Sequence, residues 1–165
     1  MSLLTLSTLL LSGFLVACGS PTKGPYTPAD EADRDPVKAA KLNEEAAELI
    51  KADPDRAEQL LREALTCDLY HGPAHNNLGV IFLERGELFE AANEFEWARK
   101  LLPGHPDPRL NLGLTLERAG RDLQAIERYR AALEVVPEHI PTIQALARLM
   151  VRSKTPWRIS PSCWT

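Results

Sequence analysis

The chain has 165 residues, of which 44% are hydrophobic and 25% are charged, so wholesale disorder and collagen-like sequence are excluded. The formal net charge of −4 argues against a general affinity for nucleic acid or for acidic membrane surfaces. Three cysteines are too few for a disulfide scaffold, and the low aromatic content of 6%, beside plentiful Ala and Leu, favours helix.

The first eighteen residues have the pattern of an export signal. Residues 3–17 are apolar or small and carry no charge, and this run is shorter than the roughly 20 residues that a membrane-spanning helix needs. The run ends in Leu15-Val16-Ala17-Cys18, which resembles the lipobox of bacterial lipoproteins, although no Lys or Arg precedes it. An alternative is a buried apolar helix of a soluble fold.

The lipobox resemblance implies a location. Residues 1–17 are then a signal peptide, Cys18 is lipidated, and the protein belongs to the bacterial cell envelope, where it faces the periplasm. No Asp follows Cys18, so the resemblance favours the outer membrane over the inner membrane. Several acyl chains on one cysteine anchor a protein firmly. Membrane contact is expected through this anchor only.

Residues 18–35 are predicted to form a tether. The stretch has no apolar periodicity and contains Pro21, Pro25 and Pro28. These prolines predict a semi-extended linker that holds the folded part clear of the lipid surface.

From residue 36 onward the sequence repeats with a period of 34. Leu-Gly-x2-Phe at residues 78–82 and Ala-x3-Phe at residues 91–95 return as Leu-Gly-x2-Leu at 112–116 and Ala-x3-Tyr at 125–129. This pattern resembles that of the tetratricopeptide repeat (TPR) family. The resemblance implies an all-α solenoid of helix-turn-helix units with about three and a half repeats. Their predicted limits are 37–70, 72–105 and 106–139, a half repeat at 140–152, and an irregular tail at 153–165.

The glycines of the repeats fall at two kinds of position. Gly79 and Gly113 are expected to let paired helices approach closely, because glycine has no Cβ. Gly86 and Gly120 are expected to lie where the first helix of each pair ends.

The C-terminal end of the array is predicted to be incomplete. Ile143, Leu146 and Met150 fit the first helix of a fourth repeat, but no second helix is predicted after it. The apolar side of that helix is then exposed or covered by the tail. A shifted reading frame or truncated gene, a partner helix that completes the repeat, and a tail that folds back are alternative explanations.

No catalytic or metal-binding pattern is present. No serine lies between Val37 and Arg152, and histidines that recur every 34 residues are too far apart to share a zinc ion. Carboxylates such as Glu84 and Glu94 are expected mostly on solvent faces. We therefore expect no enzymatic activity, metal or cofactor. A disulfide between Cys67 and Cys163 is left open.

The TPR resemblance implies a binding surface. The first helix of each pair then lines a concave groove, and the residues mapped to it by resemblance include Asn43, Asn76, Asn77, Val80, Asn111, Leu114, Arg118, Arg148 and Arg152. Asn77 and Asn111 are expected to bind a peptide backbone, because an amide both donates and accepts hydrogen bonds. The alternative is that each Asn orients a neighbouring helix.

The charges of this predicted groove bear on the ligand. Chaperone-binding TPR domains use a basic clamp for a C-terminal carboxylate, and its Lys is absent here because Asn76 and Leu110 occupy those positions. Arg118, Arg148 and Arg152 are expected to gather at the C-terminal end and to favour an acidic segment, unless they are ordinary surface charge.

The function implied is that of a lipid-anchored periplasmic scaffold or adaptor. It binds an unidentified peptide or envelope protein, as pilotins of secretins and adaptors of cell-wall hydrolases do. The alternative is a truncated targeting fragment of a larger TPR-containing enzyme or signalling protein.

Overall fold

A computed structural model describes residues 33–153 of the chain. The predicted signal peptide, Cys18, most of the tether, Cys163 and the tail from residue 154 onward lie outside the described residues.

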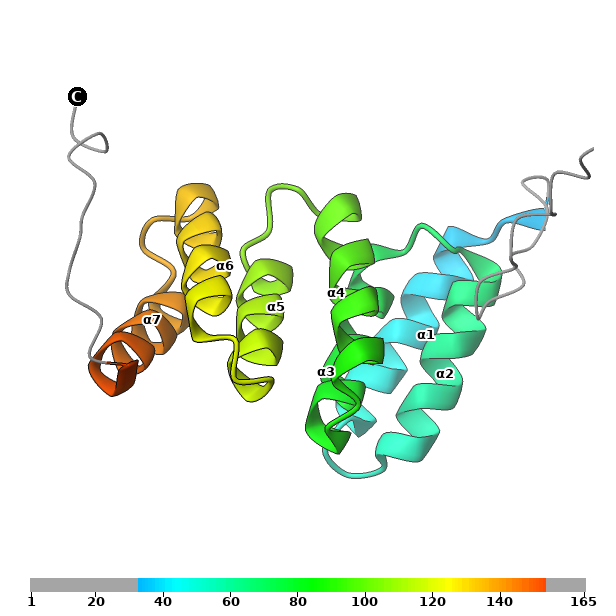
Figure 1. Cartoon of the computed structure of the whole chain (residues 1–165). Coiled ribbons are helices and arrows are strands. Elements are labelled where there is room, and N and C mark those ends of the chain that lie inside the picture. Colours follow the sequence, from blue (N-terminus) through cyan, green and yellow to red (C-terminus); the bar gives the residue numbers. More distant parts are fainter. Residues whose placement is uncertain (1–32, 154–165) are drawn as a thin grey trace, which may run out of the picture.

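The described residues form seven helices, which follow one another as antiparallel neighbours along the molecule (Figure 1). Three helix pairs are followed by a single last helix, which confirms the predicted all-α solenoid of about three and a half repeats. The helices are α1 (Pro36–Leu49), α2 (Pro54–Cys67), α3 (Gly72–Arg85), α4 (Leu88–Leu101), α5 (Asp107–Arg118), α6 (Asp122–Val135) and α7 (Ile140–Ser153). None of these helices is both long and apolar enough to cross a membrane.

Aspartate caps fix where the first two helices begin. The Asp35 carboxylate accepts a hydrogen bond of 2.9 Å from the Lys38 N–H at the start of α1, and Asp53 accepts one of 3.0 Å from the Arg56 N–H at the start of α2. Each cap satisfies a backbone donor that has no partner within its helix. A proline follows each aspartate, where its fixed φ suits the first turn.

The folded array extends slightly beyond its predicted N-terminal limit. Arg34 lies in the predicted tether, but its guanidinium donates a hydrogen bond of 2.7 Å to Asp68, whose side chain is only 4% exposed. The Asp35 N–H also donates a hydrogen bond to the carbonyl of Cys67. Residues 34 and 35 are therefore part of the first repeat, because they close the end of its second helix.

Both glycine predictions are confirmed. Gly86 and Gly120 follow α3 and α5 with φ of +80° and +73°, a left-handed conformation that favours glycine. A Cβ at Gly79 would lie 2.6 Å from the Phe95 ring, and a Cβ at Gly113 would collide with the Tyr129 ring. The aromatic side chain of each second helix therefore packs directly on the backbone of its first helix.

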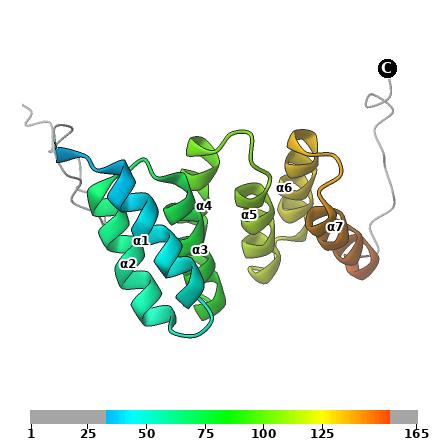
Figure 2. The same ribbon diagram turned by 180° about the vertical axis from the view of Figure 1, so that it is seen from behind.

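The helices bury two adjoining cores. One core is formed by α1, α2, α3 and α4 together with Leu112 of α5. The other core is formed by α5, α6 and α7 around Tyr129 and Leu149. The first helices of consecutive repeats also contact one another, α1 with α3, α3 with α5, and α5 with α7. Figure 2 shows the array from behind, where this succession can be followed from α1 to α7.

The last helix differs in part from the prediction. Ile143 is 41% exposed, as an uncovered side of α7 requires, whereas Met150 is 4% exposed and belongs to the second core. Met150 is buried because α5 and α6 already cover its side of the helix.

Candidate protein-binding face

The predicted binding residues all lie on the first helices of the repeats. We call their surface the first-helix face. These four helices contact one another in sequence, so the predicted residues lie on neighbouring helices. They are Asn43 on α1, Asn76, Asn77 and Val80 on α3, Asn111, Leu114 and Arg118 on α5, and Arg148 and Arg152 on α7.

Two amide pairs link consecutive first helices. Asn77 Nδ2 on α3 donates a hydrogen bond of 2.9 Å to Asn43 Oδ1 on α1, and Asn111 Nδ2 on α5 donates one of 3.0 Å to Asn76 Oδ1 on α3. All four side chains are half-buried. These hydrogen bonds correspond to the alternative in which each Asn orients a neighbouring helix. Each amide nevertheless carries two N–H donors and two acceptor lone pairs, so one bond leaves capacity for a ligand.

Apolar side chains accompany the amides. Val80 and Leu114, which are equivalent residues of α3 and α5, are half-buried and pack at the edge of the two cores. The middle of the first-helix face therefore combines amides with a partly exposed apolar surface.

Arg118 ties α5 to α3. Its guanidinium donates to the backbone carbonyl of Leu83 and, at 2.9 Å, to the Glu84 carboxylate. Both acceptors lie at the C-terminal end of α3.

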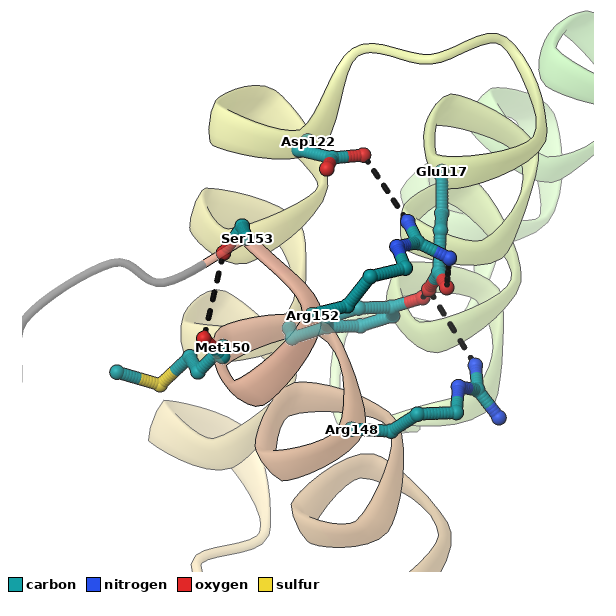
Figure 3. A network of polar contacts seen from close by, with 7 residues as sticks. Glu117, Asp122, Arg148, Met150, Arg152 and Ser153 are labelled. Atoms are coloured by element: carbon teal, nitrogen blue, oxygen red, sulfur yellow. Dashed lines mark hydrogen bonds and ion pairs between the residues drawn. The ribbon is translucent and has the colours of Figure 1, made fainter.

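The other two predicted arginines meet at Glu117 of α5 (Figure 3). Arg152 lies 2.9 Å from one oxygen of Glu117 and 3.1 Å from Asp122, and Arg148 lies 3.3 Å from the second oxygen of Glu117. The Glu117 side chain is only 9% exposed. Arg148 and Arg152 therefore do gather at the C-terminal end of the face, but around carboxylates of their own chain.

Tyr129 completes the surroundings of Glu117. Its hydroxyl donates a hydrogen bond of 2.7 Å to Glu117 Oε2. Burial of the ring, reinforced by this bond and by the negative charge of Glu117, raises the pKa of Tyr129 above its ordinary value of 10.0. Sequence reasoning missed Glu117. The sequence signal that could have identified Glu117 is its position in the repeat, because Glu117 is equivalent to the buried Leu83 of α3.

A buried polar pair inside the second repeat was also missed. His75 is fully buried, its Nε2 donates a hydrogen bond of 2.9 Å to the Leu69 carbonyl, and its Nδ1 lies 2.7 Å from Glu94 Oε2. Trp97 stacks on the imidazole with the ring centroids 5.7 Å apart. The prediction that Glu94 lies on a solvent face is wrong, because this carboxylate is 5% exposed and bound to His75.

The histidines that recur every 34 residues, His71, His105 and His139, lie at the entry to the next helix. His71 is the N-cap residue of α3. His105 and His139 precede α5 and α7, and both approach Asp107, at 3.5 Å and 3.2 Å. Among residues 33–153 no group of three or more metal-ligating side chains is arranged to hold a metal ion.

Comparisons with known proteins agree with this arrangement. No protein-family model matches the chain. The chain is 31% identical over 98 residues to Tetratricopeptide repeat protein 8 of Mus musculus, a match that covers 59% of this chain and 19% of that protein.

Solved structures resemble the fold more completely. The first TPR of Spaghetti (RPAP3) bound to the HSP90 peptide SRMEEVD superposes with a TM-score of 0.68 at 17% identity, covering 74% of this chain and 98% of that chain. The crystal structure of MamA gives a TM-score of 0.64 at 21% identity, over 73% of this chain and 71% of that chain. The chain therefore has the fold of a tetratricopeptide repeat domain.

Proposed function

We propose that the chain is a non-enzymatic adaptor that binds an extended peptide or a partner protein on its first-helix face. The observation that carries this proposal is the pair of amide contacts, Asn77 with Asn43 and Asn111 with Asn76, on consecutive helices. These contacts hold the amides in place while part of their hydrogen-bonding capacity stays available. The TPR domains of RPAP3, which share this fold, are bound to an HSP90 peptide and to an HSP70 peptide.

The charges of the face suggest how a ligand is recognised. Arg118 has Glu84 as its partner, Arg148 and Arg152 share Glu117, and Arg152 also pairs with Asp122. Because these guanidinium charges are already balanced, an acidic ligand would have to displace a carboxylate of the chain. We propose that the ligand is recognised mainly through its backbone and apolar side chains. Binding should then depend only weakly on salt.

We propose further that the adaptor is a lipoprotein of the bacterial envelope that faces the periplasm, with the outer membrane favoured. The lipobox-like sequence ending at Cys18 supports this location. The partner would then be an envelope protein, such as a secretin subunit or a cell-wall hydrolase. Cys18→Ala should move the protein from the membrane fraction to the soluble fraction. A variant that remains in the membrane fraction would contradict the anchor.

Site-specific photo-crosslinking tests the binding face. A photoreactive amino acid at Val80 or Leu114 should crosslink the full chain to a partner in an envelope preparation. The same amino acid at Phe89 or Leu123, which are 74% and 71% exposed on the second helices, serves as the matched control. Asn77→Ala/Asn111→Ala should weaken the crosslink while the helical circular dichroism persists. Equal crosslinking from both sets of positions would refute the first-helix face.

A second candidate is a targeting segment of a larger enzyme or signalling protein. This candidate is supported by the small share of longer proteins that the matched region spans. The match covers 19% of the mouse relative and 22% of the chain of a Thermobaculum terrenum O-GlcNAc transferase mutant. A continuous reading frame beyond residue 165 that encodes a further domain would support it.

A further inference from the structure

The second repeat contains a buried titratable pair, His75 on α3 and Glu94 on α4. His75 is fully buried, Glu94 is 5% exposed, and His75 Nδ1 lies 2.7 Å from Glu94 Oε2. In the third repeat the equivalent positions hold Arg109 and Arg128, of which Arg128 is exposed. Packing of a helix pair in this array therefore does not require a histidine and a carboxylate at these positions.

The contacts of His75 fix how many protons the pair holds. Its Nε2 lies 2.9 Å from the Leu69 carbonyl, and because a carbonyl oxygen only accepts hydrogen bonds, Nε2 carries a hydrogen. One further proton lies between Nδ1 and Glu94 Oε2, since this contact needs one donor and one acceptor. The pair is then neutral as a whole, on whichever of the two atoms this proton resides. Another proton would leave a net positive charge in a buried site, which is costly.

The charged groups around the pair do not compensate an added proton. Asp68 lies at the turn that leads into α3, but the Arg34 guanidinium already binds its carboxylate at 2.7 Å. Lys100 of α4 lies over the ring of Trp97, which stacks on the imidazole of His75. Since Arg34 balances Asp68 and Lys100 is itself positive, protonation of the pair leaves its charge unbalanced.

A second histidine of the same turn responds to acid in the same direction. His71 is the N-cap residue of α3, and its Nε2 is buried without a hydrogen-bond partner among residues 33–153. Burial, opposed by the charge of Asp68 and reinforced by His75, lowers the pKa of His71 below its ordinary value of 6.5. Protonation of His71 therefore also disfavours the folded arrangement at the start of α3.

We propose that acid opens the contact of α3 with α4 at His75 and thereby weakens ligand binding on the first-helix face, which is regulation that rests on the function proposed above. His75 immediately precedes Asn76 and Asn77 on α3. The amides of these two residues are hydrogen-bonded to Asn111 of α5 and Asn43 of α1. Movement of this part of α3 therefore displaces both amide contacts together. The transition falls between about pH 8 and pH 5, where histidine changes its charge.

Hydrogen exchange of the purified full chain at pH 7.5 and pH 5.0, corrected for the intrinsic effect of pH, tests the acid response. Protection of α3 and α4 should fall by about tenfold or more at pH 5.0, because an opening that takes up one proton is favoured by up to about tenfold per pH unit. Protection of α6 should fall less. A wild type that loses protection equally in α3 and α6, or not at all, would overturn the proposal.

A variant without the titrating pair shows whether the response belongs to it. His75→Phe/Glu94→Leu keeps a ring against Trp97 and introduces the residue type that α2 has at the equivalent position, the buried Leu60. This variant should lose most of the acid response while its circular dichroism at pH 7.5 stays helical. His105→Phe, at a histidine that is 56% exposed, is the matched control and should respond like the wild type. A helical double variant with an undiminished response would overturn the proposal.

The photo-crosslink from position 80 tests the link to binding. Its yield should fall several-fold from pH 7.5 to pH 5.0 in the wild-type background and much less in the His75→Phe/Glu94→Leu background. Loss of α3 protection with an unchanged crosslink would overturn the proposed effect on binding. A first-helix face that crosslinks to no partner at either pH would refute the proposed function instead, and the exchange measurement would still decide the acid response.

Discussion

The hydroxyl of Tyr129 on α6 donates a hydrogen bond of 2.7 Å to Glu117 Oε2 on α5, within a single helix pair. The same carboxylate also binds Arg148 and Arg152 of α7. One buried acid therefore joins the third repeat to the last helix, and its surroundings lead to two predictions.

Tyr129→Phe should make the stability of the folded chain less sensitive to alkaline pH. The pKa of Tyr129 is raised in the folded chain, so its contribution is fully present below the unfolded value of about 10 and is lost as pH rises above that value. Urea unfolding from pH 8 to 11 should show a steeper decline for the wild type than for the variant. Tyr70→Phe, at a 58% exposed tyrosine, is the control and should decline like the wild type.

Glu117→Gln should loosen α7. The change removes the negative charge that Arg148 and Arg152 share, while the third repeat keeps its apolar core. Hydrogen exchange should quicken in residues 140–153 more than in α1 to α4, because local opening follows the loss of local contacts. The same change at the exposed Glu84, which pairs with Arg118, should leave α7 unaffected. Uniformly faster exchange would contradict this role of Glu117.

Glu94→Gln and Glu94→Ala should differ sharply. Since His75 Nε2 donates to the Leu69 carbonyl, Nδ1 of a neutral ring accepts a hydrogen bond, and the amide introduced by Glu94→Gln can donate it. Glu94→Ala instead removes this partner from a fully buried imidazole, which should cost about 1–3 kcal/mol of unfolding free energy. Chemical denaturation measures both variants. Equal losses would show that the hydrogen bond to Nδ1 contributes nothing specific.

Gly113→Ala should destabilise the third repeat. The added methyl would collide with the Tyr129 ring, and overpacking of this kind typically costs about 1–3 kcal/mol. Gly104→Ala is the matched control, because nothing lies within 4 Å of a Cβ at that position, and it should change the stability by less than about 0.5 kcal/mol. Thermal unfolding of the two variants gives the comparison.

Asp68→Asn should reduce the sensitivity of the chain to acid. Burial alone would raise the pKa of Asp68, but hydrogen bonds from Arg34 and the Tyr70 N–H and the charge of Arg34 together hold it below its ordinary value of 3.8. A lowered pKa contributes stability above about pH 4 that is lost as pH falls through the folded value. The wild type should therefore lose more stability than the variant between pH 6 and pH 2. Arg34→Gln should reduce this acid dependence in the same way.

Much of the fold was predictable because it depends on local chemistry and on a strict period. Gly86 and Gly120 could be assigned to helix ends, since only glycine adopts a positive φ at little cost. Gly79 and Gly113 could be assigned to close contacts, because a residue without a side chain recurs among apolar positions of the repeat. The TPR resemblance also assigned the predicted binding residues to the first helices, where the structure has them.

What the sequence by itself determined is therefore the helical repeat, its phase and the residues that share a face. Only the tertiary structure decided the polar partners: Asn77 with Asn43, Arg152 with Glu117, and the buried Glu94 with His75. The reason is physical, because periodicity gives the direction of a side chain from its helix. Its partner depends on the distance and angle between helices, which the packing of the whole array sets.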